Sequence, residues 1–173
     1  MAWTSKFVMF ACACIIILST YAVYNLNGNS MDFSNRQIVL VVSDSMDGEE
    51  DRYDVDSFPA NTLVMIEHVP DNEIRFLRVG QVISYYDEGQ LIHHRIVQVN
   101  DGSLYVKGDN GHSTDKVLFS DINGVVVGTN SWAGQAVSWL YNNFILFLVA
   151  MFILCSIFII VAVRSSNLDK VVS

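Results

Sequence analysis

The residues best suited to chemistry are one serine, one histidine pair and two aspartates, which follow one another along the middle of the chain. Ser45 comes after the apolar run IVLVV, so it lies at the exposed end of a predicted strand. His93 and His94 are adjacent in the later run LIHHRIVQV, and Asp109 and Asp115 follow them. A serine hydroxyl needs a positioned base to act as a nucleophile, and a third group must orient that base. The order of residue types therefore favours a serine hydrolase with a histidine base.

Residue types alone leave several assignments open. His93 and His94 alternate across a strand, so they face opposite sides and only one of them can be the base. The serine and both aspartates are also compatible with ordinary turn residues.

Four ordered boxes resemble those of type I signal peptidases, in the histidine-using branch found in archaea, endospore-forming bacteria and the endoplasmic reticulum. The boxes are Ser43-x-Ser45-Met46, the strand GQVISYY, His94-Arg95-Ile96, and Lys107-Gly108-Asp109-Asn110 followed by Asp115. The resemblance covers most of the segment between two apolar stretches. Three features depart from the family pattern: Asp44 replaces a common glycine, Gln81 replaces a common aspartate, and an acidic insertion follows Met46.

The resemblance implies a role for each residue of the site. Ser45 would attack the scissile carbonyl, and its backbone N–H and the Ser43 hydroxyl would stabilise the oxyanion. His94 would be the general base. Asp115 would orient it and raise its pKa, with Asp109 as a supporting carboxylate, although spacing does not choose between the two acids. The implied reaction is the removal of signal peptides from exported proteins after small residues, with no cofactor and no metal.

Two positions qualify this interpretation. The bacterial branch of the same superfamily uses a lysine base activated by desolvation, which makes Lys107 a rival base. Lys107 belongs, however, to a box that the lysine-using and histidine-using branches share, so the resemblance gives it a structural role. Asp44 carries a Cβ that restricts the backbone presenting Ser45. Two alternatives to a general signal peptidase therefore stay open: a catalytically impaired, membrane-tethered β domain that binds a protein partner, and a specialised peptidase that processes a few secreted proteins.

Two uncharged apolar segments, residues 7–24 and 144–163, are long enough to cross a bilayer. Lys6 precedes the first, and basic residues follow the second, which is typical of cytoplasmic flanks. The sequence therefore predicts a two-pass integral membrane protein with both termini cytoplasmic and the intervening domain extracytoplasmic. The first segment is also compatible with a cleavable secretory signal.

The domain between these segments is predicted to be mostly β, because short alternating apolar runs are separated by turn residues. The predicted strands cover 37–42, 62–69, 73–79, 81–86, 91–99, 103–108 and 124–128. The predicted organisation is residues 1–24 as N-terminal flank and transmembrane anchor, 25–143 as catalytic domain, 144–163 as C-terminal transmembrane helix, and 164–173 as cytoplasmic tail.

The net charge of the predicted domain indicates which kinds of partner it can bind. The domain carries seven basic and seventeen acidic residues, a net charge of −10, which disfavours nucleic acid as a partner. The expected partners are the signal peptides of preproteins, membrane lipid and the protein export channel. The acidic loop, residues 47–61, lacks the Gly-centred, Glu-ended pattern of a calcium-binding loop and is predicted to be solvated.

Overall fold

The computed structural model describes residues 13, 15–17, 20 and 30–172, without the side chains of 159, 162, 163 and 165–172. The chain divides into two compact units. Gly28–Ser138 form the β unit, and Met1–Asn27 with Trp139–Ser173 form the other. Most of the predicted first membrane segment, residues 7–24, lies outside the described residues.

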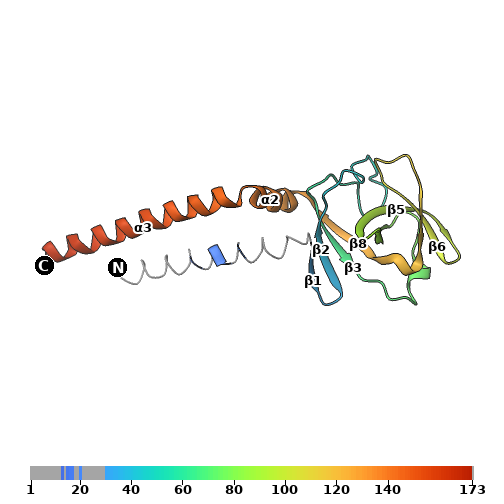
Figure 1. Ribbon diagram of the computed structural model, residues 1–173, viewed down its shortest axis with the longest axis horizontal. Coiled ribbons are helices and arrows are strands. Elements are labelled where there is room, and N and C mark those ends of the chain that lie inside the picture. The colour runs from blue at the N-terminus through green and yellow to red at the C-terminus, as the bar shows by residue number, and fades with distance from the viewer. Residues whose placement is uncertain (1–12, 14, 18–19, 21–29, 173) are drawn as a thin grey trace. The chain divides into compact units, whose positions relative to one another are not determined.

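The β unit contains one eight-stranded antiparallel sheet, which confirms the mostly-β prediction (Figure 1). The strand order is β1-β2-β3-β8-β4-β5-β6-β7. The strands are β1 (Ser30–Phe33), β2 (Arg36–Leu40), β3 (Leu63–Glu67), β4 (Val82–Asp87), β5 (Gln90–Asn100), β6 (Ser103–Lys107), β7 (Asp115–Leu118) and β8 (Ile122–Asn130). The short helix η2 (Phe119–Asp121) connects β7 to β8.

Strand β4 is the centre of the core, because apolar side chains pack on both of its faces. Val82 belongs to one buried cluster with Val39, Met46 and Phe58. Ile83 belongs to a second cluster, formed mainly by strands β4 to β8. Both residues are 0% exposed. Since neighbouring strand residues point to opposite faces, apolar side chains are buried on both sides of β4.

The prediction of a strand over 73–79 was wrong. The helix η1 (Ile74–Phe76) and an irregular segment lie there instead. Ile74 and Leu77 are buried, whereas Phe76 and Val79 are exposed. Burial therefore repeats after three residues, as in a 3₁₀ turn, and not after two as in a strand.

The C-terminal part of the described chain is a pair of helices, α2 (Ser131–Asn142) and α3 (Phe144–Val172). Helix α3 contains all of the predicted second membrane segment. Among the described residues, no single helix is long and apolar enough to cross a membrane. Helix α2 and residues 144–158 meet that requirement together, with a bend of 81° between them.

Candidate active site

Ser45 lies in a turn that follows β2. The chain first stays beside the residues before β3, since Val41 N–H donates to the Thr62 carbonyl at 2.9 Å. It then turns, and Asp47 N–H donates to the Asp44 carbonyl at 3.0 Å. Ser45 is half-buried in this turn. Among the hydrogen bonds of the described residues, none is donated by the Ser45 backbone N–H, so this group is free to donate to a ligand.

The expected oxyanion partner lies close to the expected nucleophile. The Ser43 hydroxyl oxygen is 3.3 Å from the Ser45 hydroxyl oxygen. Ser43 is exposed. Its hydroxyl is therefore close enough to Ser45 to act on the same bound group.

The loop between β6 and β7 holds the Ser45 turn in place. Asn110 N–H donates to the Ser45 carbonyl at 3.0 Å, and the Asn110 side-chain amide donates to the Asp44 carbonyl at 3.3 Å. Gly108 lies between the serine and the histidine. A Cβ at that position would be 2.6 Å from the Ser45 carbonyl oxygen and 3.2 Å from His94 Nε2. Only glycine therefore allows this close approach of the two segments.

His94 is positioned by β5, with its two ring nitrogens in different surroundings. Nδ1 lies 3.4 Å from an Asp115 carboxylate oxygen and 3.0 Å from the Tyr85 hydroxyl. Nε2 faces Gly108, on the side of the Ser45 turn. No hydrogen bond joins Ser45 to His94 in the described part of the chain, as is common before substrate binds. The arrangement leaves Nε2 as the nitrogen available to the serine.

Burial determines the direction in which the pKa of His94 moves. The side chain is only 14% exposed. Desolvation lowers the pKa of His94, while the charges of Asp115 and Asp109 and the hydrogen bond that His94 donates to Asp115 oppose that change. The expected effect of Asp115, which is to raise the pKa of His94, is present, but the larger effect of burial gives a net lowering. A lowered pKa keeps the imidazole neutral, which is the form that accepts a proton.

His93 has a different environment from its neighbour. It is 6% exposed, and its Nδ1 lies 2.8 Å from the Ser84 hydroxyl oxygen. Burial, followed by the proximity of His94, lowers its pKa to about 4. These contacts suit a packing residue that stays neutral.

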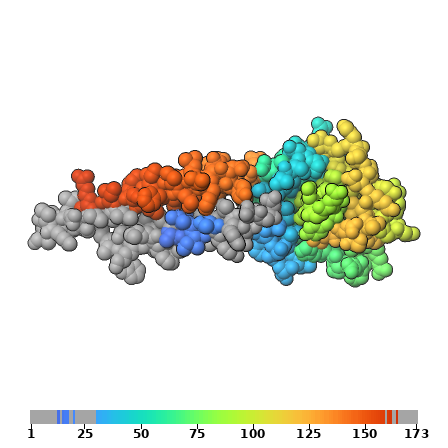
Figure 2. All heavy atoms as spheres, in the orientation of Figure 1, coloured from blue at the N-terminus to red at the C-terminus, as the bar shows by residue number. Residues whose placement is uncertain are grey.

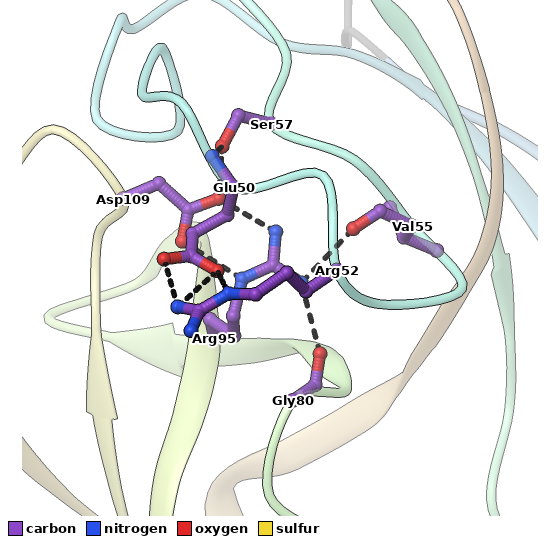
Figure 3. Close-up of polar contacts among 7 residues, drawn as sticks. All are labelled: Glu50, Arg52, Val55, Ser57, Gly80, Arg95 and Asp109. Atoms are coloured by element: carbon purple, nitrogen blue, oxygen red, sulfur yellow. Dashed lines mark hydrogen bonds and ion pairs between the residues drawn. The ribbon is translucent and has the colours of Figure 1, made fainter.

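Asp109 is engaged by a buried arginine (Figure 3). Arg95 Nε donates to one carboxylate oxygen at 2.8 Å, and Arg95 Nη2 donates to the other at 2.6 Å. The Ser57 hydroxyl also donates to Asp109, at 2.6 Å. Arg95 Nη1 donates to the Val55 and Gly80 carbonyls, at 2.9 Å each. Asp115 is therefore the acid at the His94 ring, and Asp109 is the acid that joins loops together.

The acidic loop packs against the β6–β7 loop through this network. Figure 2 shows the two segments in contact on the surface of the β unit, in cyan and yellow. Ser57 connects the acidic loop to Asp109, because its hydroxyl donates to Asp109 and also accepts from the Glu50 N–H at 3.0 Å. Glu50 in turn pairs with Arg52 at 2.7 Å, as Figure 3 also shows. The loop predicted to be solvated is thus largely exposed but is also tied to the site by part-buried hydrogen bonds.

Sequence reasoning missed two residues near the site, Ser57 and Tyr85. Ser57 carries no signal of its own in the sequence, because its partner Asp109 is 52 residues away. Tyr85 could have been found. It lies on β4, which pairs with β5, and alternation along the strand indicates which side chains share a face.

The positions that depart from the family pattern are accommodated locally. Asp44 does not adopt a positive φ, so its Cβ meets no backbone restriction. Its carboxylate accepts from the Ala60 N–H at 2.8 Å. The Gln81 side-chain oxygen accepts from the Arg78 N–H at 2.7 Å. Both side chains therefore cap turns of the β unit.

Lys107 is placed opposite Arg95 in the β5–β6 register. Among the described residues, no hydrogen bond or ion pair to its side chain is found. Those residues also include no group of three His, Cys, Asp or Glu side chains that could hold a metal ion.

A cleft of about 710 Å³ extends from the Ser45 turn. Most of its lining residues come from β2 and the segment after it, and from the first half of β5. They include Val39, Val41, Ser43, Ser45, Leu91, Ile92 and His94. In a flat sheet of this order, β2 and β5 would be about 19 Å apart. The curl of the sheet therefore brings them to one cleft, with Ser45 and His94 both in its wall.

Comparison with known proteins adds no relative. A scan against sequence models of protein families finds no match for this chain. A search of curated proteins likewise finds no similar sequence.

Proposed function

We propose that the protein is a membrane-anchored serine endopeptidase that removes signal peptides from exported proteins. One observation carries the proposal. Ser45 and His94 Nε2 approach each other at Gly108, at the wall of one cleft, while Asp115 lies against the opposite ring nitrogen. Such an ordered series of nucleophile, base and orienting carboxylate is the arrangement that activates a serine hydroxyl.

The chemistry follows from these positions. The Ser45 hydroxyl oxygen attacks the scissile carbonyl carbon as its proton moves to His94 Nε2. The Ser45 N–H and the Ser43 hydroxyl stabilise the oxyanion, and each such donor is typically worth about 3 kcal/mol. The C–N bond then breaks, and His94 returns the proton to the leaving amine. Water, deprotonated by His94, hydrolyses the acyl-enzyme and frees Ser45.

The walls of the cleft favour an extended peptide as the substrate. Residues 90–94 of β5 pair with β4 on one side, while β6 pairs only with Arg95–Asn100. Their second edge therefore has no strand partner among the described residues. Such an edge binds an extended chain through main-chain hydrogen bonds, and side-chain pockets supply the specificity. The apolar lining from Val39, Val41 and Leu91 suits the uncharged residues of a signal peptide.

The membrane location rests on the apolar segments. Residues 144–163 carry no charge and lie in helix α3. Helix α2 carries no charged residue either, and Trp132 on it is 81% exposed. An anchored enzyme with a peptide cleft would meet its substrates as they leave the export channel. Preference for small residues at the cleavage site is implied by the family resemblance.

The test is a cleavage assay with the full chain in detergent. The intact chain should convert a preprotein to one shorter product, with its new N-terminus after a small residue. Ser45→Ala should give no product, whereas Ser120→Ala, on the exposed turn η2, should match the intact chain. No cleavage by folded intact protein across a panel of preproteins, or equal cleavage by Ser45→Ala, would contradict the proposal.

A further inference from the structure

The His94 ring has a second neighbour at the same nitrogen as Asp115. The Tyr85 hydroxyl lies 3.0 Å from Nδ1, closer than the Asp115 oxygen at 3.4 Å. Tyr85 is 4% exposed, whereas the Asp115 side chain is 49% exposed. The Tyr85 and His94 rings are 5.9 Å apart and tilted by 57°. The orienting nitrogen is therefore held by a buried hydroxyl as well as by an exposed carboxylate.

The sheet fixes the place of this hydroxyl. In the β4–β5 register, His94 is opposite Ile83 and Tyr85 is opposite Ile92. Tyr85 and His94 are thus diagonal neighbours on one face, a spacing that aromatic side chains span. Strand β4 is also paired on its other side, with β8. Tyr85 therefore belongs to a strand that is held by a partner on each side.

We propose that Tyr85 is a positioning residue for His94, and that Asp115 sets the direction of the hydrogen bond between them. Neutral imidazole carries a proton on one nitrogen and a lone pair on the other. An ionised carboxylate only accepts, so Asp115 favours a proton on Nδ1. The Tyr85 hydroxyl oxygen then accepts a hydrogen bond from the Nδ1 proton, and the lone pair on Nε2 faces the Ser45 turn.

Without Asp115, the same hydroxyl acts in the opposite direction. Burial and the charges of Asp115 and Asp87 raise the pKa of Tyr85 to about 12, so it keeps its proton and can donate. Donation to Nδ1 would move the imidazole proton to Nε2, where it blocks transfer from Ser45. Tyr85 therefore helps the reaction when Asp115 is present and hinders it when Asp115 is absent. This catalytic consequence rests on the proposed function, whereas the position of the imidazole proton does not.

The direct test is ¹⁵N NMR of the full chain, labelled at histidine, in detergent micelles at neutral pH. The His94 signals are assigned by their loss in His94→Gln. The intact chain should show the proton on Nδ1, Asp115→Ala should show it on Nε2, and Asp115→Ala with Tyr85→Phe should show an averaged pair. Tyr105→Phe, on β6, should match the intact chain. The proposal fails if the Asp115→Ala signals are the same with and without the Tyr85 hydroxyl.

A second label covers the case in which Tyr85→Phe does not fold. Uniform 3-fluorotyrosine makes each phenol a stronger donor without removing it. In Asp115→Ala, this label should shift the His94 nitrogen signals further toward the form protonated at Nε2. Unchanged His94 signals there would overturn the proposal.

The kinetic arm is a double-mutant cycle on preprotein cleavage. Tyr85→Phe should lower kcat about 10-fold with little change in KM when Asp115 is present, and should raise kcat about 10-fold in Asp115→Ala. If the effects of Tyr85→Phe and Asp115→Ala on kcat simply added, the predicted reversal of the Tyr85→Phe effect would be overturned. If the NMR signals behave as expected but no variant affects cleavage because the intact chain is inactive, the proposed function fails and the positioning role stands.

Discussion

Asp109 and Asp115 lie six residues apart in the sequence and have opposite surroundings. The Asp109 side chain is 3% exposed and pairs with Arg95 through both oxygens. The Asp115 side chain is 49% exposed and lies 3.4 Å from a single histidine nitrogen. One carboxylate is enclosed in a complete network, whereas the other remains at the surface beside the ring that would take the proton.

The difference separates stability from reactivity. A buried ion pair whose donors and acceptors are all matched holds loops in one arrangement, and losing one partner leaves a charge without compensation. A half-exposed carboxylate contributes little to folding, yet its charge reaches a neighbouring imidazole. We therefore expect Asp109 substitutions to affect the fold and Asp115 substitutions to affect the reaction.

The largest expected effect is on turnover. Asp115→Ala should lower kcat by about 100-fold to 10,000-fold, because the imidazole loses the charge that favours proton transfer. KM and the free energy of unfolding should change little. Steady-state kinetics and urea unfolding check both parts. An Asp115→Ala enzyme with full kcat would break the comparison.

The next effect is on stability. Asp109→Ala should lower the free energy of unfolding by about 3–5 kcal/mol, since Arg95 would stay buried without its partner. Asp115→Ala should lower it by less than about 1 kcal/mol. Thermal and urea unfolding of the two variants in one detergent gives the measurement. Equal losses would show that the two carboxylates do not divide their roles in this way.

A smaller effect concerns pH. Asp115 raises the pKa of His94 against the larger lowering by burial, and the imidazole must be neutral to act as a base. Removing that charge lowers the pKa further, so in Asp115→Asn the acidic limb of kcat/KM should move to lower pH. Asp109→Asn should move it less, as Asp109 is the weaker influence. If the acidic limb of kcat/KM moved only in Asp109→Asn, Asp109 and not Asp115 would be the acid that acts on His94.

The smallest effect is expected at the lysine. Lys107→Ala should change kcat by less than about 10-fold, because His94 and not Lys107 faces the Ser45 turn. The control is His94→Ala under the same conditions. An inactive Lys107→Ala enzyme beside an active His94→Ala enzyme would assign the base to the lysine.

The sequence predicted the sheet because alternation and turn residues are local signals. Six of the seven predicted strands correspond to β2, β3, β4, β5, β6 and β8. Strands β1 and β7 were missed, since each has four residues and weak alternation. The prediction of a strand over 73–79 was wrong. Ile74 and Leu77 are buried three residues apart, which is the spacing of a helical turn, and a short apolar run does not distinguish a strand from such a turn.

The predictions for the site likewise succeeded where the signal was local and failed where it depended on distant segments. Ser45, His94 and the two acids could be named from ordered boxes. The resemblance also favoured His94 as the neighbour of Asp115. The Arg95 partner of Asp109 was not predicted, because this ion pair forms only where the folded chain brings β5 and the β6–β7 loop together. The need for glycine at position 108 arises where two distant segments meet, so spacing alone could not reveal it.

The most direct measurement of the central claim is kcat/KM for one preprotein with four proteins: the intact chain, Ser45→Ala, His94→Ala and the double variant. If Ser45 and His94 act as one unit, each single variant should lose at least about 1,000-fold, and the double variant should lose no more than the worse single one. Either single variant retaining the activity of the intact chain, or losses that multiply in the double variant, would contradict a serine nucleophile activated by His94.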